Sequence, residues 1–303
     1  MSWKPIIVGV DASFEAAEAV AFAARLAERA GTRVQPVHAI RDALGSSQAP
    51  DAGRYRNALI QHARAQLIGV LRDSVPENTL AALSVRFGPA PLVLKQVTAG
   101  LGAELIVLGG KHHSALSRWL GGSTSLDVAR TADVPVLVTA GPATTIRRVL
   151  VAVDLSGAAR PTLQGAERYA DMFGAELRAI SVLEPLSVIP EATPPYDATA
   201  HYALLEELLQ RDVWPLIKRP GVEKIARYGS AFETIQQEVE DWRADLLVVG
   251  SHGKGWAERM LVGSATERLL NHLPTSLLVV PARTAEPLAP IAARDALAAC
   301  AIG

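Results

Sequence analysis

In the second half of the chain, glycines and a hydroxyl residue are spaced as in a loop that binds phosphate. Gly250 and Gly253 are followed by the pair Gly263 and Ser264, with nine residues between Gly253 and Gly263. Glycines lack the Cβ that would keep a ligand away from the backbone, and the unpaired N–H groups at the start of a helix attract anions. The spacing is therefore typical of a phosphate site, although an ordinary strand-to-helix connection also places glycines at its turns.

The elements expected around these residues would bring them together. The apolar run 246–249 predicts a short buried strand that ends at Gly250. The spacing of residues 265–270 predicts a helix, and Ser264 is in the position to cap it.

The same motif occurs twice in the chain, 141 positions apart. Its recurring residues are Gly109, Gly122 and Ser123, found again as Gly250, Gly263 and Ser264. Nearer the start of each copy, Asp11 recurs 143 positions later as Asp154. So long a period indicates duplicated domains, and 303 residues suffice for two. We expect one domain over 1–143, a second over 144–283 and a tail over 284–303.

Short apolar runs and amphipathic segments alternate in both copies. The expected strands are 5–10, 34–40, 83–87, 105–108, 134–138, 148–153, 176–183, 223–228, 246–249 and 276–280. The expected helices are 14–30, 55–71, 91–99, 123–132, one ending at 173, 202–217, 232–242 and 264–272, with Pro215 distorting the end of its helix. This order predicts an α/β protein with two tandem, doubly wound, parallel five-stranded sheets. Ligands of such sheets bind at the carboxyl ends of the strands, where Asp154 and Gly250 would meet.

Composition favours a globular protein of the cytoplasm. The chain is 49% hydrophobic and 20% charged, and its one cysteine, Cys300, excludes an intrachain disulfide framework. It lacks an apolar run of the roughly 18 residues that a membrane span needs, so no membrane association is expected. Its 30 basic and 31 acidic residues give a net charge of −1, which makes nucleic acid an unfavourable main partner.

The second motif, placed behind a strand and with Asp154 closing the first strand of its unit, resembles the nucleotide-binding members of the universal stress protein family. The likeness covers about 4–141 and 146–282, as in family members that carry two such domains in tandem. It implies an adenine nucleotide alpha hydrolase-like fold. It also implies a stress-response role in which ATP, with or without Mg²⁺, is the ligand.

The resemblance assigns positions in the second unit to parts of the nucleotide. Asp154 would lie at the adenine and ribose end, and Val182 would meet the base. The loop residues around ribose and phosphate would be Gly250, His252 and Gly253. The residues holding the phosphates would be Gly263, Ser264, Ala265 and Thr266.

The first unit departs from this pattern. Its corresponding residues are Asp11, Ala39, Gly109, Gly122, Ser123 and Thr124. However, His112 stands where the second unit has Gly253, and a residue other than glycine rarely adopts positive φ. Three alternatives stay open: a degenerate structural partner, an altered anion site, or a metal site from His112 and His113. The two histidines lack cysteine or carboxylate partners at ligand spacing, so no metal site is assigned.

Other phosphate and catalytic motifs are absent from the sequence. Gly253-Lys254 is followed by Gly255, so the ordinary P-loop is missing, and Glu258 interrupts a dinucleotide fingerprint. No Gly-x-Ser-x-Gly elbow is present, and no catalytic residue is assigned.

Three functions follow from these observations. The leading hypothesis is an ATP-binding regulatory protein that senses nucleotide and acts through its conformation or assembly. The alternatives are an interaction module that uses the fold without nucleotide, and a weak ATPase. In the family's strand order, 134–138 and 276–280 are edge strands, so the two units would pair as an intrachain pseudo-dimer, with further homodimerisation compatible.

Overall fold

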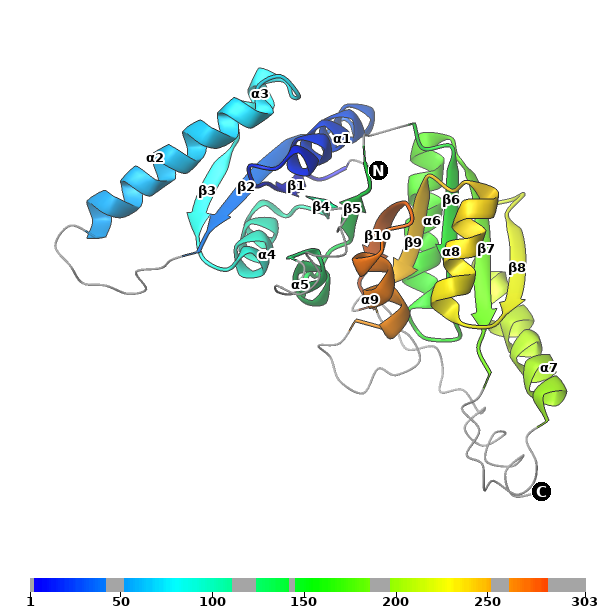
Figure 1. The fold of residues 1–303 in the computed structure, drawn as a ribbon. Coiled ribbons are helices and arrows are strands. Elements are labelled where there is room, and N and C mark those ends of the chain that lie inside the picture. The colour runs from blue at the N-terminus through cyan, green and yellow to red at the C-terminus, as the bar shows by residue number, and fades with distance from the viewer. Residues whose placement is uncertain are drawn as a thin grey trace.

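Two βα units lie side by side in the computed structural model (Figure 1). The structure describes residues 3–41, 52–110, 124–141, 145–185, 197–251 and 262–282. The elements of the first unit are β1 (Ile6–Gly9), α1 (Phe14–Ala30), β2 (Val34–Ile40), α2 (Ala52–Leu71), α3 (Glu77–Ala81), β3 (Ser84–Phe87), α4 (Ala90–Leu101), β4 (Leu105–Gly109), α5 (Thr124–Thr131) and β5 (Val136–Thr139). The elements of the second unit are β6 (Arg148–Ala152), α6 (Ala159–Phe173), β7 (Glu176–Leu183), α7 (Ala198–Leu208), β8 (Glu223–Tyr228), α8 (Ala231–Trp242), β9 (Leu246–Gly250), α9 (Ser264–Asn271) and β10 (Ser276–Val280).

The described strands form one sheet that runs through both units. Their order is β3-β2-β1-β4-β5-β10-β9-β6-β7-β8. Neighbouring strands within each unit are parallel, whereas β5 and β10 pair antiparallel at the seam, with Leu278 opposite Leu137. The expected pairing of these two edge strands is therefore confirmed.

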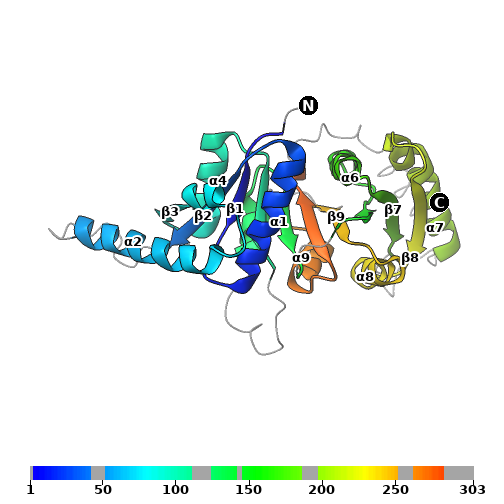
Figure 2. The same ribbon diagram turned by 90° about the horizontal axis from the view of Figure 1, so that it is seen from above.

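Helices cover both faces of this sheet (Figure 2). One buried cluster joins residues of α1, α6 and α7 on one face, and another joins α4, α5, α8 and α9 on the other. Each cluster draws residues from both units, so the hydrophobic core continues across the seam. The doubly wound α/β fold predicted from the sequence is confirmed.

Local chemistry explains where α1 begins and ends. The Ser13 hydroxyl accepts a hydrogen bond from the Ala16 N–H at 3.2 Å, as an N-cap does. At the other end Gly31 has φ 63°, a left-handed conformation that glycine adopts without a steric penalty. The Ser13 cap fixes the start of α1 directly after β1. This start lies at the edge of the sheet where the first unit's candidate residues lie.

Two expectations about helices need correction. The single helix expected over 202–217 stops at Leu208, and a π-helical turn (Leu209–Val213) and a 3-10 turn (Trp214–Leu216) follow. Pro215 lies in the 3-10 turn and has no N–H to continue the α-helical hydrogen bonds, so the expected distortion of the helix end by Pro215 is confirmed. The short helix α3 was not expected, since five residues are too few to show a helical period. In the part of the chain described, no helix is both long and apolar enough to cross a bilayer.

Candidate functional site

The ends of the glycine loop in the second unit are held together by backbone hydrogen bonds. Ser251 continues from β9 and donates its N–H to the Val280 carbonyl on β10 at 2.8 Å. Its own carbonyl accepts the N–H of Gly263 at 3.0 Å. The residue that follows β9 and the residue that precedes α9 are therefore hydrogen-bonded to each other, at the carboxyl end of β9.

Thr266 adds a side-chain tie at the same point. Its hydroxyl donates to the carbonyl oxygen of Gly250 at 3.0 Å, and the residue is buried at 7% exposure. The first turn of α9 is thus fixed against the last residue of β9. Thr266 is one of the residues expected to hold phosphate, and in this structure its hydroxyl donates its hydrogen bond to the Gly250 carbonyl.

The start of α9 differs from the expectation in one detail. The N-cap is Gly263, and Ser264 is the first helical residue, so the expected capping by Ser264 is wrong. The physical reason is that the Gly263 carbonyl already accepts the first helical bond, from Glu267 N–H at 2.8 Å. The N–H groups of Ser264, Ala265 and Thr266 precede that bond, at the positive end of the helix dipole, and the Ser264 side chain is exposed.

Asp154 lies just beyond β6, the strand next to β9, and Val182 lies on β7, the strand on the other side of β6. The order β9-β6-β7 makes these three strands neighbours, and Ala152 on β6 is in register with Val249 on one side and Ile180 on the other. Asp154 and Val182 are each two residues beyond this level. They therefore share the carboxyl edge of the sheet with Gly250.

The environments of Asp154 and Val182 are different. Asp154 is half-buried, and its Oδ1 accepts the Ser156 N–H at 3.1 Å, which closes a turn after β6. Val182 is 9% exposed and belongs to the buried cluster beneath α8 and α9. One carboxylate and one apolar side chain thus lie at the edge where the helix N-terminus and the glycines meet.

The first unit repeats this arrangement with glycines fixed by packing. The Asp11 carboxylate accepts hydrogen bonds from the Ser13 N–H and the Ser13 hydroxyl. A Cβ on Gly109 would lie 2.5 Å from the Glu15 carbonyl oxygen, and one on Gly110 would lie 2.5 Å from the Thr139 carbonyl oxygen. These two glycines are thus required by close contact with the backbone of α1 and of β5. Of the other candidates, Ala39 is half-buried on β2 and Thr124 is the exposed first residue of α5.

Several candidate residues lie outside the described ranges. They are His252 and Gly253 in the second unit, and His112, His113, Gly122 and Ser123 in the first. The expected tail, 284–303, is outside them as well, with Cys300. Within the described residues there is no group of three or more histidine, cysteine, aspartate or glutamate side chains placed to hold a metal ion.

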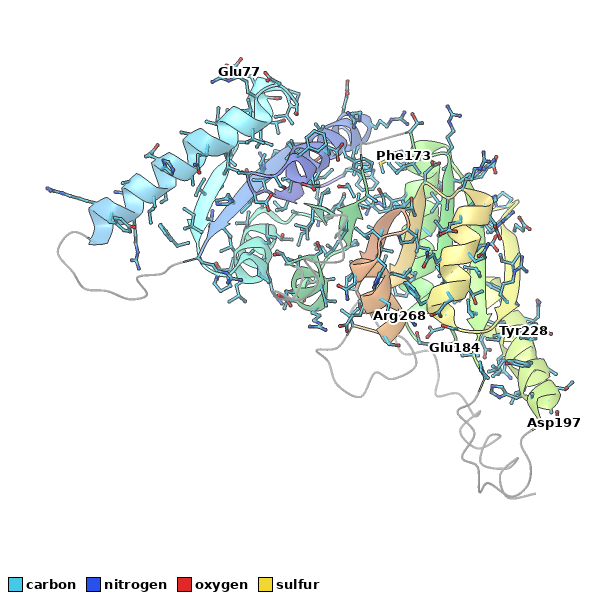
Figure 3. All side chains as sticks on the ribbon, viewed as in Figure 1. Glu77, Phe173, Glu184, Asp197, Tyr228 and Arg268 are labelled. Atoms are coloured by element: carbon cyan, nitrogen blue, oxygen red, sulfur yellow. The ribbon has the colours of Figure 1, made fainter. Side chains whose placement is uncertain are left out.

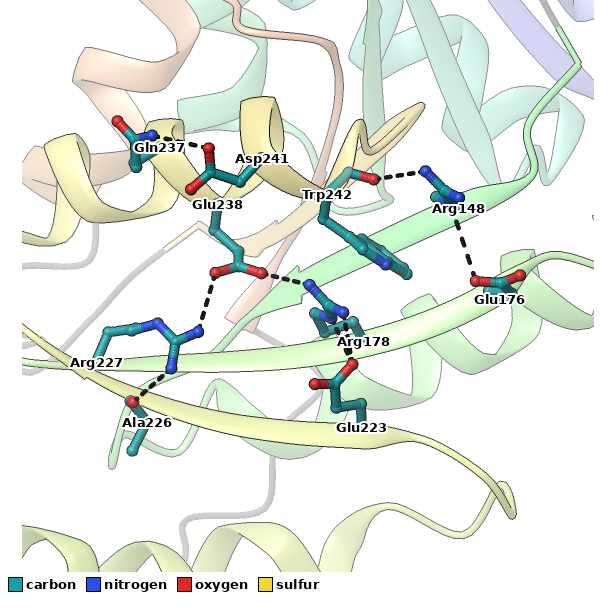
Figure 4. A network of polar contacts seen from close by, with 10 residues as sticks. All are labelled: Arg148, Glu176, Arg178, Glu223, Ala226, Arg227, Gln237, Glu238, Asp241 and Trp242. Atoms are coloured by element: carbon teal, nitrogen blue, oxygen red, sulfur yellow. Dashed lines mark hydrogen bonds and ion pairs between the residues drawn. The ribbon is translucent and has the colours of Figure 1, made fainter.

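The charged cluster shown in Figure 4 lies elsewhere on the second unit. Arg178 pairs with Glu238 at 2.6 Å and with Glu223 at 2.6 Å, and its guanidinium lies 4.5 Å from the centre of the Trp242 ring. Arg178 is the third residue of β7 and Glu223 the first of β8, so the cluster starts at the amino ends of these strands. The charged cluster ties α8 to the sheet, and it was not predicted from the sequence. The visible signal was an arginine inside an otherwise apolar strand.

A second charged contact joins α9 to α8 near the candidate site. Arg268 Nη2 lies 2.6 Å from Glu233 Oε1, and this hydrogen bond holds the pKa of Glu233 below its usual value. Figure 3 shows Arg268 and Glu184 on the same, lower side of the second unit. Glu184 directly follows β7, and its Oε1 accepts the Ala231 N–H at the start of α8 at 3.0 Å. Both helices are therefore anchored at the carboxyl edge of the sheet.

Comparisons with known proteins agree over both units. The model of the universal stress protein family matches residues 2–140 and again residues 145–281. A universal stress protein of Mycolicibacterium smegmatis is 28% identical over 293 residues, covering 92% of this chain and 97% of that protein. One from Mycobacterium tuberculosis strain H37Rv is 25% identical, covering 90% and 96%. The crystal structure of a universal stress protein from Archaeoglobus fulgidus has a TM-score of 0.64 at 19% identity, covering 92% and 98%, and this likeness concerns the fold alone.

Proposed function

The chain belongs to the universal stress protein family, and we propose that its second unit binds ATP as a regulatory nucleotide sensor. One observation supports the proposal: the hydrogen bond from Gly263 N–H to the Ser251 carbonyl, which holds the carboxyl end of β9 against the N-terminus of α9. A ligand at the end of β9 would therefore also meet the first turn of the helix.

The chemistry of this position suits a polyphosphate. The N–H groups of Ser264, Ala265 and Thr266 and the exposed Ser264 hydroxyl are donors at the positive end of a helix. Gly263 presents backbone without a side chain. Gly250, His252 and Gly253 would line the loop around ribose and phosphate, and Mg²⁺ would arrive on the phosphate oxygens.

The neighbouring strands supply the rest of a nucleoside site. Asp154 can accept hydrogen bonds from ribose hydroxyls or from an amino group of the base, as acidic residues do at the same edge of other nucleotide-binding sheets. Val182 offers an apolar contact for the base. Because both lie at the same carboxyl edge of the sheet as Gly250, one adenine nucleotide would reach them and α9 together.

We infer binding and signalling as the role of this site, and at most slow turnover. The seam gives a route for the signal, because α9 packs against α5 of the first unit and β10 pairs with β5. A nucleotide that orders the start of α9 would act directly on the contact between the units. The first unit, whose glycines are needed for packing, would serve mainly as the partner of the second.

Isothermal titration calorimetry of the full chain with ATP tests this function. We expect one ATP per chain, and we expect mass analysis to find adenine nucleotide released when freshly purified protein is denatured. Absence of binding heat and of any thermal shift at millimolar ATP would favour the interaction module instead. Phosphate release above a blank that is lost in Asp154→Ala would favour the weak ATPase.

A further inference from the structure

A salt bridge crosses from the first unit to the helix that begins the candidate site. Arg130, in the last turn of α5, places its Nη2 3.1 Å from Glu267 Oε2 on α9. The two helices lie beside each other at the seam (Figure 1). Glu267 is the fourth residue of α9, and its N–H makes the first bond of the helix, to Gly263.

The Glu267 carboxylate is in an unfavourable place for a protein that binds phosphate. A helix rises 1.5 Å per residue, so the Cα of Glu267 lies about 6 Å along the axis from that of Gly263. This is within the screening length of about 8 Å at physiological salt, so the carboxylate would repel a polyphosphate at the helix start.

Arg130 offsets this charge. Its guanidinium is nearer to Glu267 than to its other acidic neighbour, Asp127, which is 4.0 Å away. The side chains of Arg130 and Glu267 are 31% and 40% exposed, so solvent screens their interaction only in part. With Arg130 in place, the start of α9 carries little net negative charge.

The internal repeat shows that the first unit provides such a cation to the second, but that the second unit does not provide one to the first. The position 141 residues after Arg130 is Asn271, and the position 141 residues before Glu267 is Leu126. The symmetry-related contact therefore has no charges. Arg130 therefore lies beside the unit whose glycine motif is complete. The corresponding residue beside the unit in which His112 interrupts the motif, Asn271, has no charge.

We propose that Arg130 of the first unit is a positioning residue of the second unit's nucleotide site, acting by neutralising Glu267. This inference rests on the proposed function. It gives the first unit a defined part in binding, and it makes phosphate affinity in one unit depend on a side chain of the other.

The test compares Arg130→Met, Glu267→Gln and the double variant of the full chain by calorimetry with ATP. Arg130→Met leaves the carboxylate unopposed and should weaken ATP binding by about three- to tenfold. Glu267→Gln should bind ATP at least as tightly as the wild type, and the double variant should recover wild-type affinity. A purely structural role predicts the opposite for the double variant, because the salt bridge is absent there too.

Two controls sharpen the test. Arg168→Met breaks the 2.9 Å pair with Glu104, which also joins the two units, and should change ATP affinity by less than about twofold because Glu104 directly precedes β4, at the amino edge of the sheet. Adenosine, which has no phosphates, should bind Arg130→Met and wild type equally. Equal losses in Arg168→Met and Arg130→Met, or a double variant as weak as Arg130→Met, would overturn the inference. Wild-type protein that binds no ATP would overturn the proposed function with it.

Discussion

The hydroxyl of Thr266 donates a hydrogen bond to the carbonyl oxygen of Gly250, 3.0 Å away, and so fixes the first turn of α9 to the end of β9. Together with the bond between Gly263 and Ser251, it closes the base of the glycine loop on both sides. The position of the helix N-terminus is therefore set by the protein before any ligand arrives.

Replacing Thr266 by valine should lower the free energy of unfolding. The variant keeps the shape of the side chain, while the partly buried Gly250 carbonyl loses its side-chain donor, at a cost of about 1–2 kcal/mol. Urea denaturation measures this. Thr131→Val is the matched control, because its hydroxyl donates to Asp127 O in the more exposed helix α5 and should cost about 0.5 kcal/mol or less. Equal losses in the two variants would show that the bond to Gly250 is not special.

Replacing Gly263 by valine should remove ATP binding while leaving the fold intact. Gly263 has φ −57° and ψ 145°, an extended conformation open to any residue, so the substitution introduces no backbone strain. Its side chain would instead occupy the space of the phosphate, and calorimetry should show affinity reduced by at least about tenfold. Gly122→Val, at the corresponding position of the first unit, should change affinity little. Similar losses from both would contradict one competent site per chain.

Much of the framework of this site could be predicted from the sequence because it depends on local patterns. β2, β7, β8 and β10 have the predicted bounds, and β2, β7 and β10 are short, mainly apolar runs between turn residues. The pairing of β5 with β10 followed from the family's strand order.

The rest depended on contacts that leave no local pattern. At Gly263-Ser264 two adjacent residues are both acceptable caps, and only the bond from Glu267 to Gly263 decides between them. The pair Arg130–Glu267 joins residues 137 positions apart, and no periodicity predicts it. Residue types at a seam become informative only once the pairing of the strands places the helices.

Replacing Arg168 by methionine should weaken the seam between the units. Its guanidinium lies 3.6 Å from the centre of the Trp3 ring and 2.9 Å from Glu104 Oε1, and both partners belong to the first unit. Loss of the cation–π contact and the partly shielded ion pair should cost about 1–2 kcal/mol of unfolding free energy, measured with urea.

Arg211→Met is the control for this seam variant. Arg211 pairs with its neighbour Asp212 at 2.7 Å on an exposed turn, so its loss should cost about 0.5 kcal/mol or less. If both variants were equally stable, the contact with Trp3 would contribute nothing to holding the units together.

Replacing Tyr169 by phenylalanine should change how stability depends on alkaline pH. Tyr169 is buried edge-on to Trp3, with ring centres 5.6 Å apart, and burial raises the pKa of its hydroxyl far above its ordinary value of 10. Above pH 10 the unfolded chain loses this proton while the folded chain keeps it, so the contribution to wild-type stability is complete below that pH and falls as pH rises, by up to about 1.4 kcal/mol per pH unit. The phenylalanine variant lacks this term. Urea midpoints between pH 8 and pH 11 should therefore fall less steeply in the variant, and parallel curves would mean that Tyr169 ionises in the folded protein as readily as in the unfolded chain.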